Sequence, residues 1–174
     1  TVVTINGGPV TYTAEGEWRS AVSATDAGGL NLTPDAAYAN NVNAGTATAN
    51  YTYAESANHL GSSDSEDFAI GKATPTATLL VDNSPVTYDG DAKAATVAIS
   101  VSSVPGAVAN ILTGGAATQT DAGTYPVTAD FVPTDSANYN SLPAQAVGDF
   151  VIGKAASVTV VTINGGPFTY TGAA

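Results

Sequence analysis

Two clusters of acidic residues carry the side chains of this chain that are best suited to chemistry. One is Asp89-Gly90-Asp91, and the other runs from Asp64 to Asp67. Hard oxygen ligands gathered in turns suit Ca²⁺, although neither cluster has the full ligand spacing of an EF-hand, and a solvated acidic loop is the alternative interpretation. The sequence therefore predicts no cofactor other than calcium, with these ligands: Asp89, Asp91, Asp64, Glu66 and Asp67. A melting temperature that a chelator leaves unchanged would remove this prediction.

Acid–base catalysis is the second chemistry that the carboxylates raise, because glycosidases use two opposed carboxyl groups. The remaining pairs are Glu15 with Glu17 and Asp130 with Asp135. All the pairs are close in sequence, where turns are expected, and few aromatic residues are present to form a sugar platform. A nucleophile–histidine site also lacks its parts, since His59 is the only histidine and the chain has no Cys and no GxSxG motif. We expect no catalytic residue and no enzyme activity.

Trp18, the single tryptophan, stands beside Arg19 in a chain with few aromatic residues. An exposed Trp is a typical hot spot of recognition, whereas a buried one would fill a core. The sequence favours burial. Exposure of Trp18 would indicate the alternative function, a glycan- or protein-binding adhesion module that uses Trp18 or the turn loops.

The charge of the chain limits its partners. The 174 residues carry 15 acidic and 4 basic side chains, a net charge of −11. Eight carboxylates and two basic groups lie in residues 1–72, seven and two lie in residues 73–154, and none lies in residues 155–174. Without a basic surface, no nucleic-acid partner is expected. No apolar run reaches the roughly 20 residues of a transmembrane helix, so no direct membrane insertion is expected either.

Internal repetition is the strongest signal in the sequence. TVVTINGGPVTYT at Thr1–Thr13 returns with one substitution at Thr159–Thr171. FAIGKATPT at Phe68–Thr76 is matched more weakly by FVIGKAASV at Phe150–Val158. Arrays of this kind are selected for length and display more than for one active site. We divide the chain into repeat A at 1–72, repeat B at 73–154, and the first strand or strands of a following A-type repeat at 155–174.

Short strands and turns are predicted throughout. Alternating and β-branched segments, such as Ala95–Val101 and Thr124–Val132, predict strands, and Gly, Pro, Asn and Asp clusters such as Asp26–Gly29 predict the turns between them. Only Asp35–Asn43 could form a helical turn. The pattern predicts an all-β chain of small antiparallel β-sandwiches with Greek-key connections, arranged end to end, and a β-grasp module is the alternative. We expect several aromatic residues to share the core of repeat B, namely Tyr88, Tyr125, Phe131, Tyr139 and Phe150.

Three phrases resemble a known family. PVTYDG at Pro85–Gly90, TDAGTYPVTADFVPTDSANYN at Thr120–Asn140 and FVIGKA at Phe150–Ala155 are similar to bacterial Ig-like tandem repeats, the MBG-type domains of large cell-surface and adhesin proteins. Repeat A has the corresponding VNAGTATANYTYAESANH at Val42–His59, but it departs from the pattern at Glu15–Arg19. The resemblance implies Ig-like extracellular spacers or adhesin stalks, with no catalytic residue to carry over.

The expected function is therefore structural, that of a spacer or stalk repeat in a giant surface protein, adhesin or filament of a bacterial or archaeal cell. The expected partners are neighbouring repeats and identical chains in a filament. The IGKA connectors at Ile70–Ala73 and Ile152–Ala155 contain no flexible Gly/Ser tract, which favours a semi-rigid rod. Residues 155–174 lack the rest of their sheet, so we expect them to pack against a neighbouring domain or chain.

Overall fold

The protein is all-β, as the sequence predicts. The computed structural model describes residues 1–6, 10–17, 20–167 and 169–172. Within these ranges it has thirteen strands and no helix. The helical turn considered for Asp35–Asn43 is wrong, because this segment contains strand β5 (Ala37–Ala39), which pairs antiparallel with β6 (Gly45–Tyr53). Pairing with the next strand of the chain has overridden the local preference.

The strands up to β7 form two sheets that enclose one core. A three-stranded sheet has the order β1 (Val2–Ile5), β3 (Ser20–Thr25), β4 (Asn31–Leu32), and a four-stranded sheet has the order β2 (Val10–Thr11), β7 (Ser62–Gly71), β6, β5. The core combines side chains of both sheets, because Val22 of β3 packs with Ala47 and Ala49 of β6 and with Phe68 and Ile70 of β7. We call residues 1–72 the N-terminal unit.

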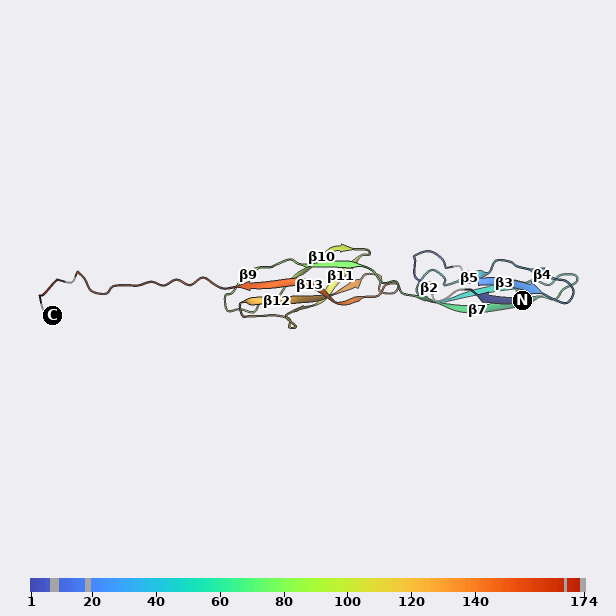
Figure 1. Cartoon of the computed structure of the whole chain (residues 1–174). Helices are drawn as coiled ribbons and strands as arrows, with labels where there is room; N and C mark the ends of the chain where they lie inside the picture. The colour runs from blue at the N-terminus through green and yellow to red at the C-terminus, as the bar shows by residue number, and fades with distance from the viewer. Residues whose placement is uncertain (7–9, 18–19, 168, 173–174) are drawn as a thin grey trace.

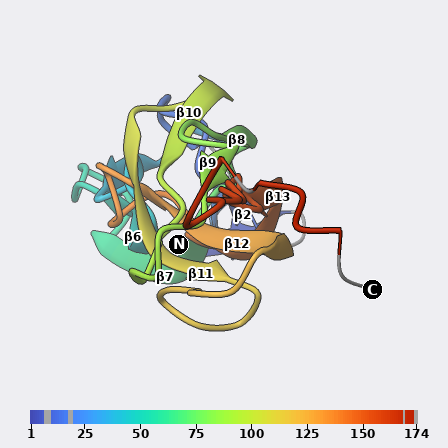
Figure 2. The same cartoon turned by 90° about the vertical axis from the view of Figure 1, so that its left-hand side faces the viewer.

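The remaining strands form a second pair of sheets. β8 (Ala77–Val81) pairs with β10 (Val97–Ser102), and a four-stranded sheet has the order β11 (Gly106–Thr113), β12 (Gly123–Pro133), β13 (Leu142–Gly153), β9 (Val86–Thr87). Seen along the long axis, β8 and β10 lie on one side and β11 and β12 on the other (Figure 2). Leu79 of β8 packs on Ala129 and Phe131 of β12 between these layers. We call residues 73–153 the C-terminal unit.

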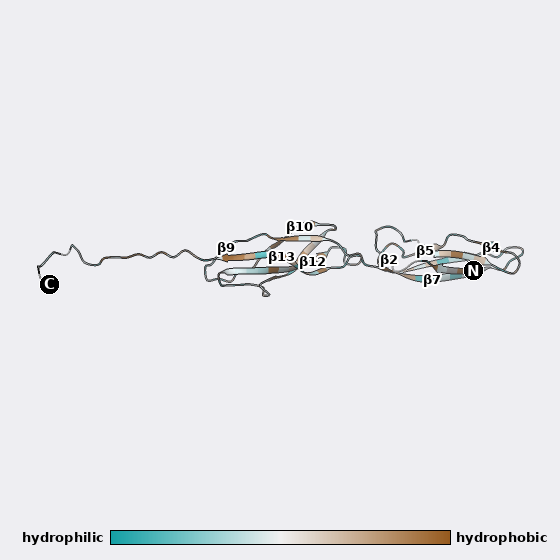
Figure 3. Ribbon diagram, viewed as in Figure 1, coloured by the Kyte–Doolittle hydropathy of each residue, from teal (hydrophilic) through white to brown (hydrophobic). Residues whose placement is uncertain are grey.

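The two units share one strand arrangement. In each, a two-residue strand pairs in parallel with the last strand, as Val10 with Ile70 in β2–β7 and Val86 with Ile152 in β9–β13. The four-stranded sheets then follow the same order, and each unit opens with an antiparallel pair, β1–β3 or β8–β10. Within the two units, hydrophobic residues gather mainly on the strands of the sheets (Figure 3). Alternation along β12 is clear, since Val127, Ala129 and Phe131 are buried while their neighbours are not.

The predicted aromatic core of the C-terminal unit is correct only in part. Phe131 and Phe150 are fully buried, and Tyr125 packs against the cluster that contains Phe150. Tyr88 is wrongly placed by the prediction, because it is 38% exposed at the end of the sheet. Tyr139 is also wrongly placed, because it contacts Tyr12 of the N-terminal unit instead of the core. Both residues lie beyond the ends of the strands, where sequence alternation does not define an inward face.

The units lie end to end, and the C-terminal tail extends from the far end of the C-terminal unit (Figure 1). The described residues of this tail form no strand, and Val160, Val161 and Ile163 are exposed. The tail therefore does not pack against the neighbouring C-terminal unit, so the expectation that it packs on a neighbouring domain is wrong for the domain that this structure contains. Pairing with a further domain or with another chain stays a prediction.

Candidate functional site at the junction of the two units

The loop between β12 and β13 forms the contact between the units. It begins with Asp135, whose Oδ1 accepts a hydrogen bond from the amide of Asn138 at 3.2 Å and whose carbonyl accepts one from the amide of Tyr139 at 3.1 Å. An Asp side chain that bonds to the backbone a few residues ahead holds a tight turn. This turn presents Asn138, which is only 7% exposed, to the N-terminal unit.

The side chain of Asn138 bonds in three directions. Its Oδ1 accepts a hydrogen bond from the amide of Ala44 at 2.8 Å, and its Nδ2 donates to Asn43 Oδ1 at 3.1 Å. Nδ2 also donates to Asp135 Oδ2 at 2.9 Å. Both donors of the amide and its acceptor are thus used, which is how a buried Asn avoids the cost of unpaired polar groups.

The connector itself is held by backbone hydrogen bonds. The amide of Ala73 donates to the carbonyl of Asn138 at 2.9 Å, and the amide of Asn140 donates to the carbonyl of Ala73 at 2.8 Å. Lys72 Nζ donates to the carbonyl of Ser136 at 2.7 Å, and Asn140 Nδ2 donates to Thr74 Oγ1 at 3.1 Å. A connector bonded to this loop at three successive residues, Lys72, Ala73 and Thr74, lacks the freedom of a flexible linker.

Two tyrosine rings close the junction. Tyr12 and Tyr139 meet edge to face, with ring centroids 5.3 Å apart and planes at 87°, the geometry that aromatic quadrupoles favour. Loss of solvent at this contact, followed by the proximity of Tyr139 and Asp135, raises the pKa of the Tyr12 hydroxyl above its ordinary value of 10.0. Tyr12 is neutral at physiological pH with or without this shift, and the raised pKa extends its neutral range to more alkaline conditions.

The predicted calcium ligands are not brought together. Asp64, Glu66 and Asp67 lie on strand β7, not in the turn that we expected, because they extend the pairing of β7 with β6. Alternation along a strand sends Glu66 and Asp67 to opposite faces, and Asp67 accepts a hydrogen bond from Thr48 Oγ1 at 2.7 Å. Among the described residues, no group of three or more His, Cys, Asp or Glu side chains is arranged to hold a metal ion.

Asp89 and Asp91 lie in a turn of the C-terminal unit, as predicted. Asp89 is bonded there, since its Oδ2 accepts from Lys93 Nζ at 2.5 Å and its Oδ1 accepts from the amide of Asp91 at 3.0 Å. The Lys93 hydrogen bond, and then the Asp91 amide, lower the pKa of Asp89 below its ordinary value of 3.8. These partners occupy both carboxylate oxygens, so Asp89 acts as a turn-stabilising acceptor in this structure.

Two other acidic residues, Asp26 and Asp130, also stabilise the backbone by accepting hydrogen bonds from amide groups. Asp26 accepts hydrogen bonds from the backbone amides of Leu30 and Gly28 and also pairs with His59. The bond from the Leu30 amide, followed by the bond to His59, lowers the pKa of Asp26. Asp130 accepts hydrogen bonds from the amide of Ala144 at 2.7 Å and from Asn110 Nδ2 at 2.6 Å. Both bonds lower the pKa of Asp130, and the bond from the Ala144 amide has the larger effect. The sequence singled out His59 only as a lone histidine without catalytic partners, and in the structure it pairs with Asp26.

The other residues that the sequence singled out lie in separate places within the described part of the chain. Trp18 and its neighbour Arg19 lie outside the described residues. Glu17 is 7% exposed and accepts a hydrogen bond from Thr13 Oγ1 at 3.0 Å, whereas Glu15 is exposed. Asp130 and Asp135 lie at different places, one in β12 and one in the junction loop.

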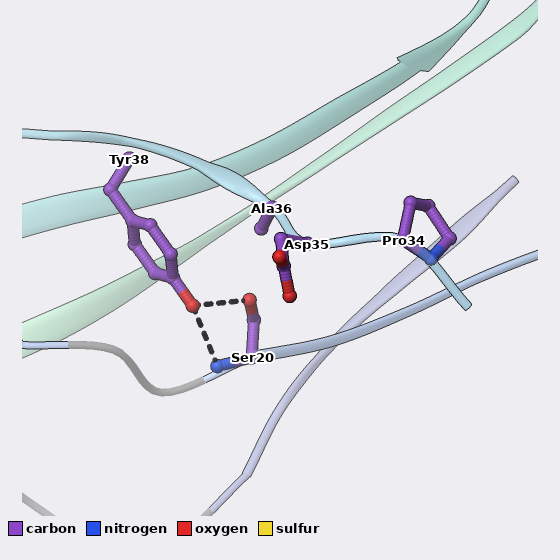
Figure 4. A pocket seen from close by; sticks show the side chains of 5 residues that line it. All are labelled: Ser20, Pro34, Asp35, Ala36 and Tyr38. Atoms are coloured by element: carbon purple, nitrogen blue, oxygen red, sulfur yellow. Dashed lines mark hydrogen bonds between the residues drawn. The ribbon is translucent and has the colours of Figure 1, made fainter.

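A hollow of about 350 Å³ lies beside β3 and β5, lined by Ser20, Pro34, Asp35, Ala36 and Tyr38 (Figure 4). The Tyr38 hydroxyl accepts from the amide of Ser20 at 3.1 Å and lies 2.6 Å from its Oγ. The described lining includes no histidine that could activate the serine. Since Ser20 is in one sheet and Tyr38 in the other, these bonds tie the two layers together.

Sequence reasoning missed the junction residues. The available signal is the phrase Ser-Ala-Asn, which occurs at Ser56–Asn58 and again at Ser136–Asn138. Of these two asparagines, Asn138 bonds across the junction, whereas Asn58 is exposed at the outer end of the N-terminal unit.

No protein-family model, curated protein or solved structure matches the chain. Within the described part of the chain, there is also no helix with the length and apolarity required to cross a lipid bilayer.

Proposed function

We propose that this chain is a structural spacer, a pair of tandem Ig-like β-sandwich repeats with Greek-key connections that holds other parts of a large surface protein apart. The observation that carries the proposal is the junction, where Asn138 bonds across to Ala44 and Asn43 while the connector residue Ala73 bonds to the same loop. Contacts on both the loop and the connector restrict bending, which a spacer requires and a flexible tether does not.

Features of the sequence support a place for this spacer in a tandem array on a cell surface. Repetition of Thr1–Thr13 at Thr159–Thr171 is typical of an array, and the phrases that resemble MBG-type Ig-like repeats favour an adhesin, stalk or filament on a bacterial or archaeal surface. A net charge of −11 spread over both units gives the chain a self-repelling surface, which keeps long arrays soluble and extended. In this proposal the partners are neighbouring repeats, and no catalysis is required.

Small-angle X-ray scattering of the full chain tests the proposal against a variant with a Gly/Ser-rich insertion between Lys72 and Ala73. The wild-type chain should give the profile of one elongated arrangement of the units. The insertion separates the connector from the Asn138 loop, so its profile should be that of a flexible ensemble. Two indistinguishable profiles, each requiring an ensemble of inter-unit angles, would remove the spacer proposal.

A further inference from the structure

The outer end of the C-terminal unit repeats the surface that the N-terminal unit presents at the junction. A hollow of about 390 Å³ opens there, and five residues line it: Tyr88, Asp121, Ala122, Lys154 and Ala155. Each is the counterpart of a residue that contacts the Asn138 loop or forms the connector. In the same order, these counterparts are Tyr12, Asn43, Ala44, Lys72 and Ala73.

The strand register fixes these equivalences independently of the sequence match. Tyr12 donates its amide to the carbonyl of Gly71, and Tyr88 donates its amide to that of Gly153. Ala44 precedes Gly45, the first residue of β6, and Gly45 pairs with Ile70. In the same way, Ala122 precedes Gly123, the first residue of β12, and Gly123 pairs with Ile152. The hollow is therefore the same structural place one unit further along.

The complementary part lies at the opposite end of the molecule. The loop Glu55–Leu60 connects β6 to β7, as Asp135–Asn140 connects β12 to β13, and it contains the same Ser-Ala-Asn phrase. Asn58, the counterpart of the junction residue Asn138, is exposed. The N-terminal unit thus presents the loop, and the C-terminal unit presents the surface that accepts it, at opposite ends of the end-to-end pair (Figure 1).

We propose that the hollow at Tyr88, Ala122 and Lys154 binds the Glu55–Leu60 loop of a second copy of this chain that follows it head to tail. The inference rests on the proposed spacer function and names its next partner. Asn58 then accepts from the amide of Ala122, Lys154 Nζ donates to the carbonyl of Ser56, and the ring at position 59 faces Tyr88. Because the two contact surfaces differ and lie at opposite ends, the association repeats without closing.

The two junctions differ in ways that the docking must accommodate. Asp121 replaces Asn43, so the Asn58 amide donates to a carboxylate, a stronger acceptor than an amide. Leu60 replaces Asn140, which removes the side-chain bond to Thr74 but retains the backbone amide that meets the connector.

In the single chain, the amide of Ser56 donates to the carbonyl of His59. On docking, this hydrogen bond breaks and the loop adopts the turn that Asp135–Tyr139 forms at the existing junction.

Cross-linking in a tandem chain tests the proposal. Residues 1–158 are followed directly by residues 1–174, which preserves the spacing of the repeated TVVTINGGP phrase. The chain has no Cys, so two cysteines introduced as Ala122→Cys in the first copy and Ala57→Cys in the second react alone with a short bismaleimide. A reference pair, Ala44→Cys with Ala137→Cys in one copy, reports on the junction already described. A control pair combines Ala122→Cys with Ser65→Cys of the second copy, on the side of the unit.

The Ala122/Ala57 pair should link at a rate close to that of the reference pair and about tenfold or more faster than the control pair, because docking raises the effective concentration. Asn58→Ala in the second copy should return the rate to the control value. If the reference pair links and the Ala122/Ala57 pair does not exceed the control, this inference is wrong and the spacer proposal stands. If the reference pair also links no faster than the control, the spacer proposal itself fails.

Discussion

At the scale of single residues, Asn and Asp side chains bond to backbone amides where strands end or bulge. Asn138 bonds to Ala44 across the junction, and Asp130 bonds to Ala144 within one sheet. The strand pairing shifts register beside Asp130 on both sides, between Ala109 and Leu112 and between Ala129 and Phe131. These polar side chains satisfy backbone groups that the ladders leave without strand partners.

Replacing Asn138 with alanine should weaken the junction measurably. The substitution removes the acceptor for the Ala44 amide and the donor to Asn43. Leaving such groups without partners should lower the free energy of unfolding in urea by about 1–2 kcal/mol. The matched control is Asn58→Ala, which changes the same repeat position at the exposed end and should cost less than about 0.5 kcal/mol. Equal effects of the two substitutions would contradict the role of Asn138.

Asp130→Asn should remove part of the acid sensitivity of the protein. The Ala144 and Asn110 hydrogen bonds lower the folded-state pKa of Asp130 below 3.8, so its contribution to stability is present above that value and lost as the pH falls through the folded-state pKa. The wild-type chain should therefore melt at a higher temperature than the variant at neutral pH, with the difference shrinking below about pH 4. A difference that is independent of pH would refute this explanation.

At the scale of elements, periodicity predicted the strands well and their ends poorly. The alternation at Thr124–Val132 identifies β12, and the Asp26–Gly29 cluster identifies a turn, because both signals are local. Strand β5 and the extension of β7 through Asp64 were missed, since both depend on pairing with β6, the adjacent strand in the chain, and have no clear alternation of their own. β-structure is decided by such pairings more than by residue preference.

The candidate site was the least predictable part. Sequence reasoning emphasised carboxylates and Trp18, whereas the described structure joins the units through Asn138, Asn43 and backbone amides. An asparagine in a loop has no chemical signature that distinguishes a cross-unit bond from a solvated turn. Only the repetition of Ser-Ala-Asn at equivalent places in both repeats carried this information.

Strand β11 passes so close to the core that Gly106 should not accept a larger residue. A Cβ atom at this position would lie 2.5 Å from the ring of Phe131, which is fully buried, and 2.7 Å from the carbonyl of Val132. Gly106→Ala should therefore lower the free energy of unfolding by about 1–3 kcal/mol.

Gly153→Ala is the control for this packing effect, because the nearest atom to a Cβ there is 3.6 Å away. It should leave stability nearly unchanged in the same urea titration. A Gly106→Ala chain as stable as Gly153→Ala would show that Phe131 and β11 can separate at little cost.

At the scale of the whole molecule, two units of the same strand arrangement are joined through a bonded connector and extend in line (Figure 1). Each has its own core, so the junction contributes direction more than folding energy. Acidic side chains on both units oppose collapse of one unit onto the other. We infer that the Asn138 loop restricts the angle between the units.

Pulsed electron paramagnetic resonance tests this claim most directly, with nitroxide labels at Ser65→Cys in β7 and Ala107→Cys in β11. Both positions are exposed, and the chain has no other cysteine. We predict one narrow distribution of label-to-label distances for this chain and a broad one when Asn138→Ala is added. A broad distribution in the presence of Asn138, unchanged by its removal, would show that the loop does not restrict the angle between the units.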